Sequence, residues 1–152
     1  MGNDYWKDDS LIVATHKDKM DLLKYEIGMF FETCDRMKRP ACCGFINNLI
    51  IESLAVHTRV LIDFFYSEKN ANKPNDLVAQ DLLSDEINWK RIRPEEADVL
   101  FNAKNKADKQ LAHLSLWRIK LSKDELKGWG KMFPDIEREL KDLINFFYSL
   151  LK

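Results

Sequence analysis

A largely apolar stretch, FINNLIIESLAVHTRVLIDFFY, runs from Phe45 to Tyr66. At about 100° per residue, Glu52, Arg59 and Asp63 fall with Asn48 on one narrow polar stripe, and Ile, Leu, Val and Phe occupy the rest of the circumference. A helix with this pattern is expected to be buried on most sides, at the centre of the fold. Charged groups in such a place need ion-pair partners or a functional role.

Apolar residues also recur with helical spacing in three other segments. We expect long helices there, over about Lys17–Met37, over Glu95–Ile119 and from near Pro134 to the C-terminus. Pro40 should end the first of these helices, because a residue before proline is pushed out of the α region. Pro134 suits a first helical position and is expected to begin the last helix.

Two shorter pieces lie between these helices. The segment Asp76–Leu83 is apolar enough for a short helix, with Asn75 as its expected N-cap. The sequence Ser122–Glu125 is a capping box that predicts a further helical piece, which Gly128 and Gly130 weaken.

Four amphipathic helices without a strand pattern predict an all-α fold. The simplest arrangement is an up-and-down four-helix bundle with one or two short extra helices, in which the first helix and the Phe45–Tyr66 helix form an antiparallel hairpin. We expect a single domain over residues 1–152, with 1–16 as a loose N-terminal segment.

The charge balance argues against a broad electrostatic field. The 24 Lys and Arg residues nearly match the 25 Asp and Glu residues, so nucleic acid or an anionic membrane would need a local patch. The compact basic and aromatic cluster is NWKRIRP, residues 88–94, where Trp89 lies beside Lys90, Arg91 and Arg93. It is either an RNA or phosphate contact or, as we favour, an exposed basic loop anchored by its tryptophan.

Several features indicate a cytoplasmic protein without a membrane partner. The first residues lack the apolar core of a signal peptide, and no segment approaches the roughly 20 apolar residues of a membrane span. Cys34, Cys42 and Cys43 are odd in number and lack CxxC spacing, which favours free thiols in a reducing compartment.

Standard catalytic motifs are missing. The sequence has no Gly-rich phosphate loop, no GxSxG and no HExxH. Glu52 precedes His57 by five residues, so on a helix the two side chains point about 140° apart, unlike a di-metal Glu-x-x-His pair. We therefore expect no metal and no cofactor, and His57 is best interpreted as a hydrogen-bonded core or interface histidine.

Arg118 falls on the apolar stripe of the third long helix, where a guanidinium needs a carboxylate. Glu52 or Asp63 on the central helix could supply it. The set of Glu52, Arg59, Asp63 and Arg118 is either a buried structural ion network, the interpretation that we favour, or a substrate-binding site.

His113 lies on a different face of the same helix. Its neighbours there, within about 40°, are Asn102, Lys106, Lys109 and Trp117. A surface or capping histidine on an ordinary polar face is the commoner interpretation of such a residue.

Two stretches resemble a widespread group of uncharacterised small bacterial helical proteins. They are NNLIIESLAVHTRVLIDFFY, residues 47–66, and NKADKQLAHLSLWR, residues 105–118. In that group, a His-x-Arg-x-Leu-x-Asp-Phe pattern precedes a later helix that carries Ala-His-Leu and a downstream Arg. The matched stretches cover about a quarter of the chain.

More distantly, the chain is similar to the HEPN (higher eukaryote and prokaryote nucleotide-binding) superfamily of helical bundles. Many members are dimeric, metal-independent ribonucleases of defence and toxin systems, with an Arg-x(4–6)-His motif. Here Lys106 has the six-residue spacing to His113, with lysine in place of arginine, and the four-residue position is Asp108. The resemblance implies RNA cleavage by 2′-hydroxyl attack, with His113 as base or acid and with Lys106 and Asn102 steadying the phosphate charge.

Two hypotheses follow. The first is a HEPN-like RNA-binding or RNA-cleaving protein that works as a homodimer. The second is a non-catalytic helical module for self-association or partner binding. The first requires His113 and Lys106 to meet the central polar stripe at a cleft, and the second requires an apolar helix face left exposed in the monomer.

Overall fold

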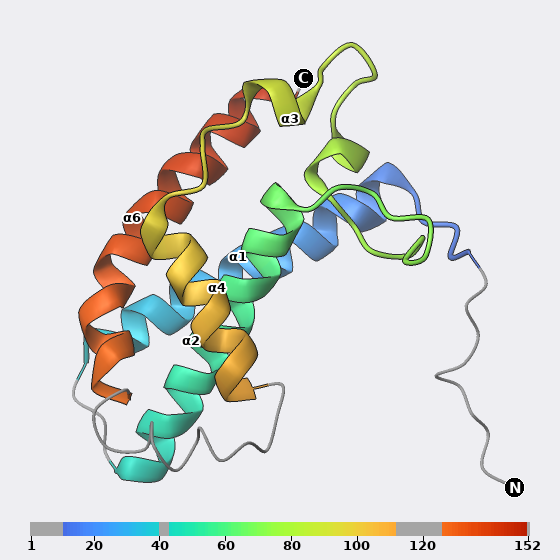
Figure 1. Ribbon diagram of the computed structural model, residues 1–152. Coiled ribbons are helices and arrows are strands. Elements are labelled where there is room, and N and C mark those ends of the chain that lie inside the picture. Colours follow the sequence, from blue (N-terminus) through green and yellow to red (C-terminus); the bar gives the residue numbers. More distant parts are fainter. Residues whose placement is uncertain (1–10, 40–42, 112–125, 152) are drawn as a thin grey trace, which may run out of the picture.

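The computed structural model describes residues 11–39, 43–111 and 126–151, and these are all-α (Figure 1). The long helices are α1 (His16–Met37), α2 (Gly44–Tyr66), α4 (Asp98–Leu111) and α6 (Leu126–Leu150). A single turn, α3 (Trp89–Ile92), and a 3-10 turn, η1 (Ala79–Leu82), lie between α2 and α4. The described residues contain no strand, which confirms the predicted all-α bundle.

Helix α2 contacts each of the other three long helices, so the apolar stretch is central as predicted. Figure 1 shows that α1 and α2 run in opposite directions and cross, and that α4 also runs opposite to α2. Helix α6 packs on α1, α2 and α4 and covers one side of the bundle (Figure 1).

A cluster of aromatic rings occupies the end of the core near α3. Phe147 of α6 is fully buried, and its ring centroid lies 5.6 Å from that of Phe64, 5.5 Å from that of Phe65 and 5.4 Å from that of Trp89. These edge-to-face contacts join α2, α3 and α6.

The first turns of α2 differ from the prediction. The six residues from Gly44 to Leu49 are all exposed, and Glu52 is exposed as well, so the prediction that this helix is buried on most sides is wrong for its N-terminal part. Buried residues begin at Ile51 and continue to Phe65. The reason is geometric, since the neighbouring helices cross α2 along its C-terminal part.

Helix α6 begins at Leu126, eight residues before the predicted start at Pro134, which lies inside the helix. Burial explains the extension, because Trp129 in the first turns is fully buried and offsets part of the cost of the glycines and the proline. A Cβ at position 128 would lie 2.2 Å from Lys106 Nζ, so Gly128 leaves room for that side chain. Gly128 and Gly130 are therefore accommodated within the helix.

The other element boundaries also shift. Helix α4 begins at Asp98 rather than near Glu95, and the part of the predicted helix beyond residue 111 lies outside the described residues, as does the capping box at 122–125. The predicted helix over 76–83 is reduced to η1, with Val78 as N-cap. Asn75 instead accepts a hydrogen bond of 2.8 Å from Ile12 N.

Helix α1 begins with a capping box. Thr15 Oγ1 accepts a hydrogen bond of 3.1 Å from Asp18 N, and Asp18 Oδ2 accepts one of 2.9 Å from Thr15 N. The hydrogen bonds from Thr15 hold the pKa of the Asp18 carboxyl below its usual value.

Asp18→Asn should therefore flatten the acid side of the stability profile. Because the folded-state pKa is the lower one, this contribution is present above the ordinary aspartate pKa of about 3.9 and is lost as pH falls through the folded value. Melting temperatures from pH 6 to pH 2 should converge for Asp18→Asn and the parent at low pH. Asp21→Asn is the control because Asp21 does not cap the helix, and an equal change in its profile would contradict the prediction.

Cys34 and Cys43 are both free thiols, the first buried and the second exposed, and Cys42 lies outside the described residues. Burial raises the pKa of the Cys34 thiol to about 12. In a Cys42→Ser variant at pH 8, Ellman's reagent should therefore modify Cys43 rapidly and Cys34 only after denaturation, because the thiolate is the reactive species. Adding Cys43→Ser should remove the rapid signal, and a rapid signal that remained would contradict the assignment.

Candidate functional site

The predicted catalytic face is only partly described. Asn102 is exposed on α4, and Lys106 lies one turn further along with its Nζ 5.7 Å from the centroid of the buried Trp129 ring. This cation–π contact engages the Lys106 ammonium in the packing of α4 against α6. His113 lies outside the described residues, so its meeting with Lys106 and Asn102 stays a prediction.

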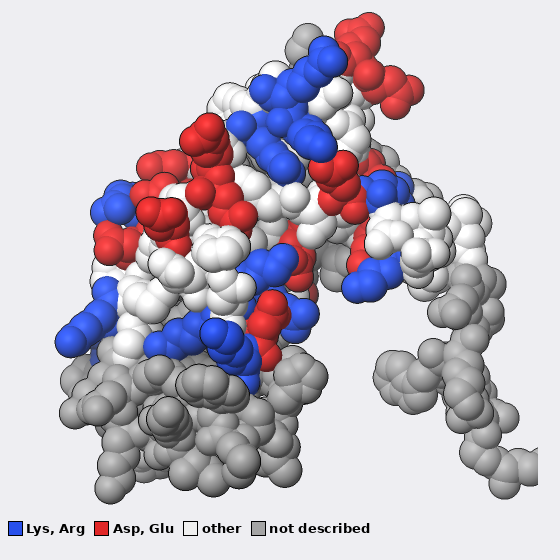
Figure 2. All heavy atoms as spheres, in the orientation of Figure 1, with Lys and Arg blue, Asp and Glu red and all other residues white. Residues whose placement is uncertain are grey.

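Much of the basic and aromatic cluster closes the C-terminal end of α2. The indole Nε1 of buried Trp89 donates to Phe65 O at 2.6 Å, and Arg93 Nη1 donates to Tyr66 O at 2.9 Å and to Phe65 O at 3.1 Å. Lys90 pairs with Glu68 at 2.6 Å. These contacts favour the anchored-loop interpretation over an RNA contact. Figure 2 shows that basic side chains gather over α3 at the top of the view, and that basic and acidic side chains are interspersed over the rest of the visible face.

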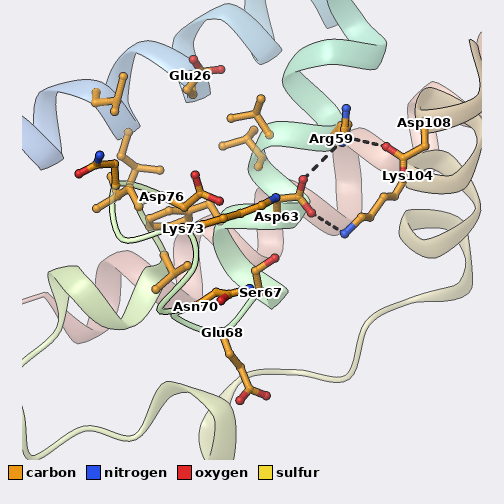
Figure 3. Close-up of a pocket in the computed structure, with 18 residues that line it drawn as sticks. Glu26, Arg59, Asp63, Ser67, Glu68, Asn70, Lys73, Asp76, Lys104 and Asp108 are labelled. Atoms are coloured by element: carbon orange, nitrogen blue, oxygen red, sulfur yellow. Dashed lines mark hydrogen bonds and ion pairs between the residues drawn. The ribbon is translucent and has the colours of Figure 1, made fainter. Parts of the chain in front are cut away.

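The central polar stripe pairs with α4. Arg59 Nε lies 2.6 Å from Asp108 Oδ1 and 3.7 Å from Asp63 Oδ2, and Lys104 Nζ binds Asp63 Oδ1 (Figure 3). These four side chains are between 34% and 41% exposed, so Arg59 and Asp63, the two that belong to the predicted buried network, are only partly buried. We call them the charge tetrad.

The partners in the charge tetrad also differ from those predicted. Lys104 and Asp108 of α4 contact Arg59 and Asp63, whereas Glu52 is exposed and Arg118 lies outside the described residues. A sequence signal for these partners existed. Each helix carries one acid and one base four residues apart, Arg59 with Asp63 and Lys104 with Asp108, so two such pairs can face each other with opposite charges in contact.

The charge tetrad forms one wall of a pocket of about 610 Å³. Figure 3 shows that the other walls come from α1, the C-terminal half of α2 and the loop that follows it. Glu26 of α1 also lines the pocket, and its Oε2 lies 2.7 Å from His57 Nδ1. His57 is buried, which confirms its interpretation as a hydrogen-bonded core histidine.

A second surface lies on the exposed side of α2. We define the α2 stripe as Phe45, Leu49, Val56 and Val60, whose residues are exposed by 68%, 45%, 42% and 39%. Their spacing of four, seven and four residues places them within about 60° of one another, and Glu52 lies between Leu49 and Val56 on the same side. The sequence rule that large apolar helices are buried gives no signal for this exposure.

No protein-family model matches the chain, and no curated protein or solved structure matches it either. Within the described residues, no helix has the length and apolar character needed to cross a membrane. The same residues contain no group of three or more His, Cys, Asp or Glu side chains placed to hold a metal ion.

Proposed function

We propose that the chain is a non-catalytic self-association module, and that it forms a homodimer through the α2 stripe. The observation that carries the proposal is the exposure of four large apolar side chains along one face of a single helix. Exposed apolar helix faces with polar residues beside them are typical of protein–protein contacts. A two-fold axis lets one patch serve both partners.

Charge complementarity favours a second copy as the occupant. If two α2 helices pack antiparallel with Val56 near the two-fold axis, Glu52 of one copy lies opposite Val60 and beside Arg59 of the other. Arg59 uses its Nε towards Asp108, and its guanidinium has further donors for a carboxylate. The symmetric contact therefore contains two Glu52–Arg59 ion pairs, one for the Glu52 of each copy.

The test is the mass of the protein in solution. Phe45→Ser combined with Leu49→Ser should convert a concentration-dependent dimer to a monomer, because both side chains contribute apolar area to the interface. Phe101→Ser is a matched control, since Phe101 is 55% exposed on α4 and outside the α2 stripe. Light scattering after size exclusion gives the mass of each variant.

Two results would count against the proposal. One is a parent protein that stays monomeric up to millimolar concentration. The other is dissociation by Phe101→Ser to the same degree as by the double variant, which would place the contact on α4 instead.

A further inference from the structure

The pocket beside the charge tetrad has the size and lining of a small-molecule site. Its volume of about 610 Å³ lies within the range of roughly 300–1,000 Å³ that is usual for ligand pockets. Apolar side chains from three segments line it, and they are Leu22, Leu23, Val60, Leu61, Phe64, Leu77 and Val78. These side chains can cover the apolar body of a ligand.

The charged groups of the lining are unequal in number. Five carboxylates line the pocket, Glu26, Asp63, Glu68, Asp76 and Asp108, against three bases, Arg59, Lys73 and Lys104. Arg59 pairs with Asp108, Lys104 pairs with Asp63, and Glu68 pairs with Lys90 outside the lining, so the charges that remain are the carboxylates of Glu26 and Asp76 and the Lys73 ammonium. The lining therefore favours a positively charged guest.

Glu26 is the group best placed to select such a guest. Its side chain is 18% exposed and lines the pocket, and its Oε2 binds His57 Nδ1. A carboxylate that is largely removed from water attracts a cation more strongly than an exposed one. Asp76, in the loop after α2, adds a second carboxylate that has no ion pair among the described residues.

We propose that this pocket binds a small organic cation, an amine or guanidinium group on a short apolar body. The cationic head lies towards Glu26, and the body lies against Leu22, Val60 and Leu77. The site adjoins the proposed dimer contact and shares Arg59 and Val60 with it. Val60 belongs to both surfaces, so the test variants leave it unchanged.

Calorimetric titration with hexylamine tests the proposal, with hexan-1-ol as a probe of the same length without the charge. Hexylamine should bind and hexan-1-ol should bind at least tenfold more weakly. Glu26→Gln should weaken hexylamine binding about tenfold or more, because it removes a charge-assisted hydrogen bond. Glu32→Gln is the control, since Glu32 lies on α1 outside the pocket and pairs with Arg36.

A second variant guards against a folding defect in Glu26→Gln. Leu22 is 52% exposed at the rim, so Leu22→Trp should leave the fold intact and obstruct the pocket. It should reduce hexylamine binding by a similar factor. Equal binding of the two probes, no binding of either, or full binding by Glu26→Gln and Leu22→Trp would each overturn the proposal. The titration is repeated with the Phe45→Ser, Leu49→Ser variant, which removes the proposed dimer contact. Hexylamine binding by this variant tests the pocket whether or not the protein forms a dimer.

Discussion

Phe147→Ala should lower the free energy of unfolding by about 3–5 kcal/mol. Phe147 is fully buried and its ring contacts those of Phe64, Phe65 and Trp89, so truncation leaves a cavity where three elements meet. The neighbouring rings are large and held by other contacts, which limits their collapse into the cavity. Urea unfolding followed by circular dichroism measures the loss.

Phe101→Ala is the matched control for this experiment. It makes the same change in a phenylalanine that is 55% exposed, and its effect on unfolding should stay within about 0.5 kcal/mol. A loss below about 1 kcal/mol for Phe147→Ala would contradict the placement of α6 against α2 and α3.

Thr58→Val should raise the free energy of unfolding by about 1–2 kcal/mol. Thr58 is fully buried in the middle of α2, and its Oγ1 has no hydrogen-bond partner in the described part of the chain. A buried hydroxyl without a partner costs free energy on folding, and valine has nearly the same shape without that cost. The same urea titration gives the difference.

Thr33→Val provides a control with the opposite sign. Thr33 is also buried, but its Oγ1 donates to Met29 O at 2.7 Å and lies 3.1 Å from Ser53 Oγ. Removing that hydroxyl loses a hydrogen bond that is already made, so the variant should be less stable than the parent by about 1 kcal/mol. If Thr58→Val destabilised the protein as Thr33→Val does, the environment assigned to Thr58 would be wrong.

Helical periodicity predicted the long helices of this fold because each lays an apolar stripe on a shared core. Boundaries were less predictable, since they depend on tertiary contacts. Pro134 was predicted to begin the last helix, yet α6 begins eight residues earlier, at Leu126. The buried Trp129 stabilises this added helical segment. The free energy gained by burying Trp129 outweighed the low helix propensity of Gly128, Gly130 and Pro134.

The candidate sites show the same division. His57 was correctly predicted as a hydrogen-bonded core residue because it lies among apolar residues on its helix, but its partner Glu26 comes from α1 and no local spacing indicates it. The tetrad partners Lys104 and Asp108 depend on how α4 crosses α2. The α2 stripe has the composition of a core face, so only the arrangement of the neighbouring helices distinguishes it from one.

Cross-linking at Val56 tests the proposed self-association most directly. Val56→Cys in a Cys42→Ser, Cys43→Ser background places a thiol near the proposed two-fold axis, while Cys34 is buried. A short bismaleimide should then give a covalent dimer in high yield, and Phe101→Cys in the same background should stay monomeric. A monomeric product from Val56→Cys, or equal cross-linking of the two variants, would contradict a dimer formed through the α2 stripe.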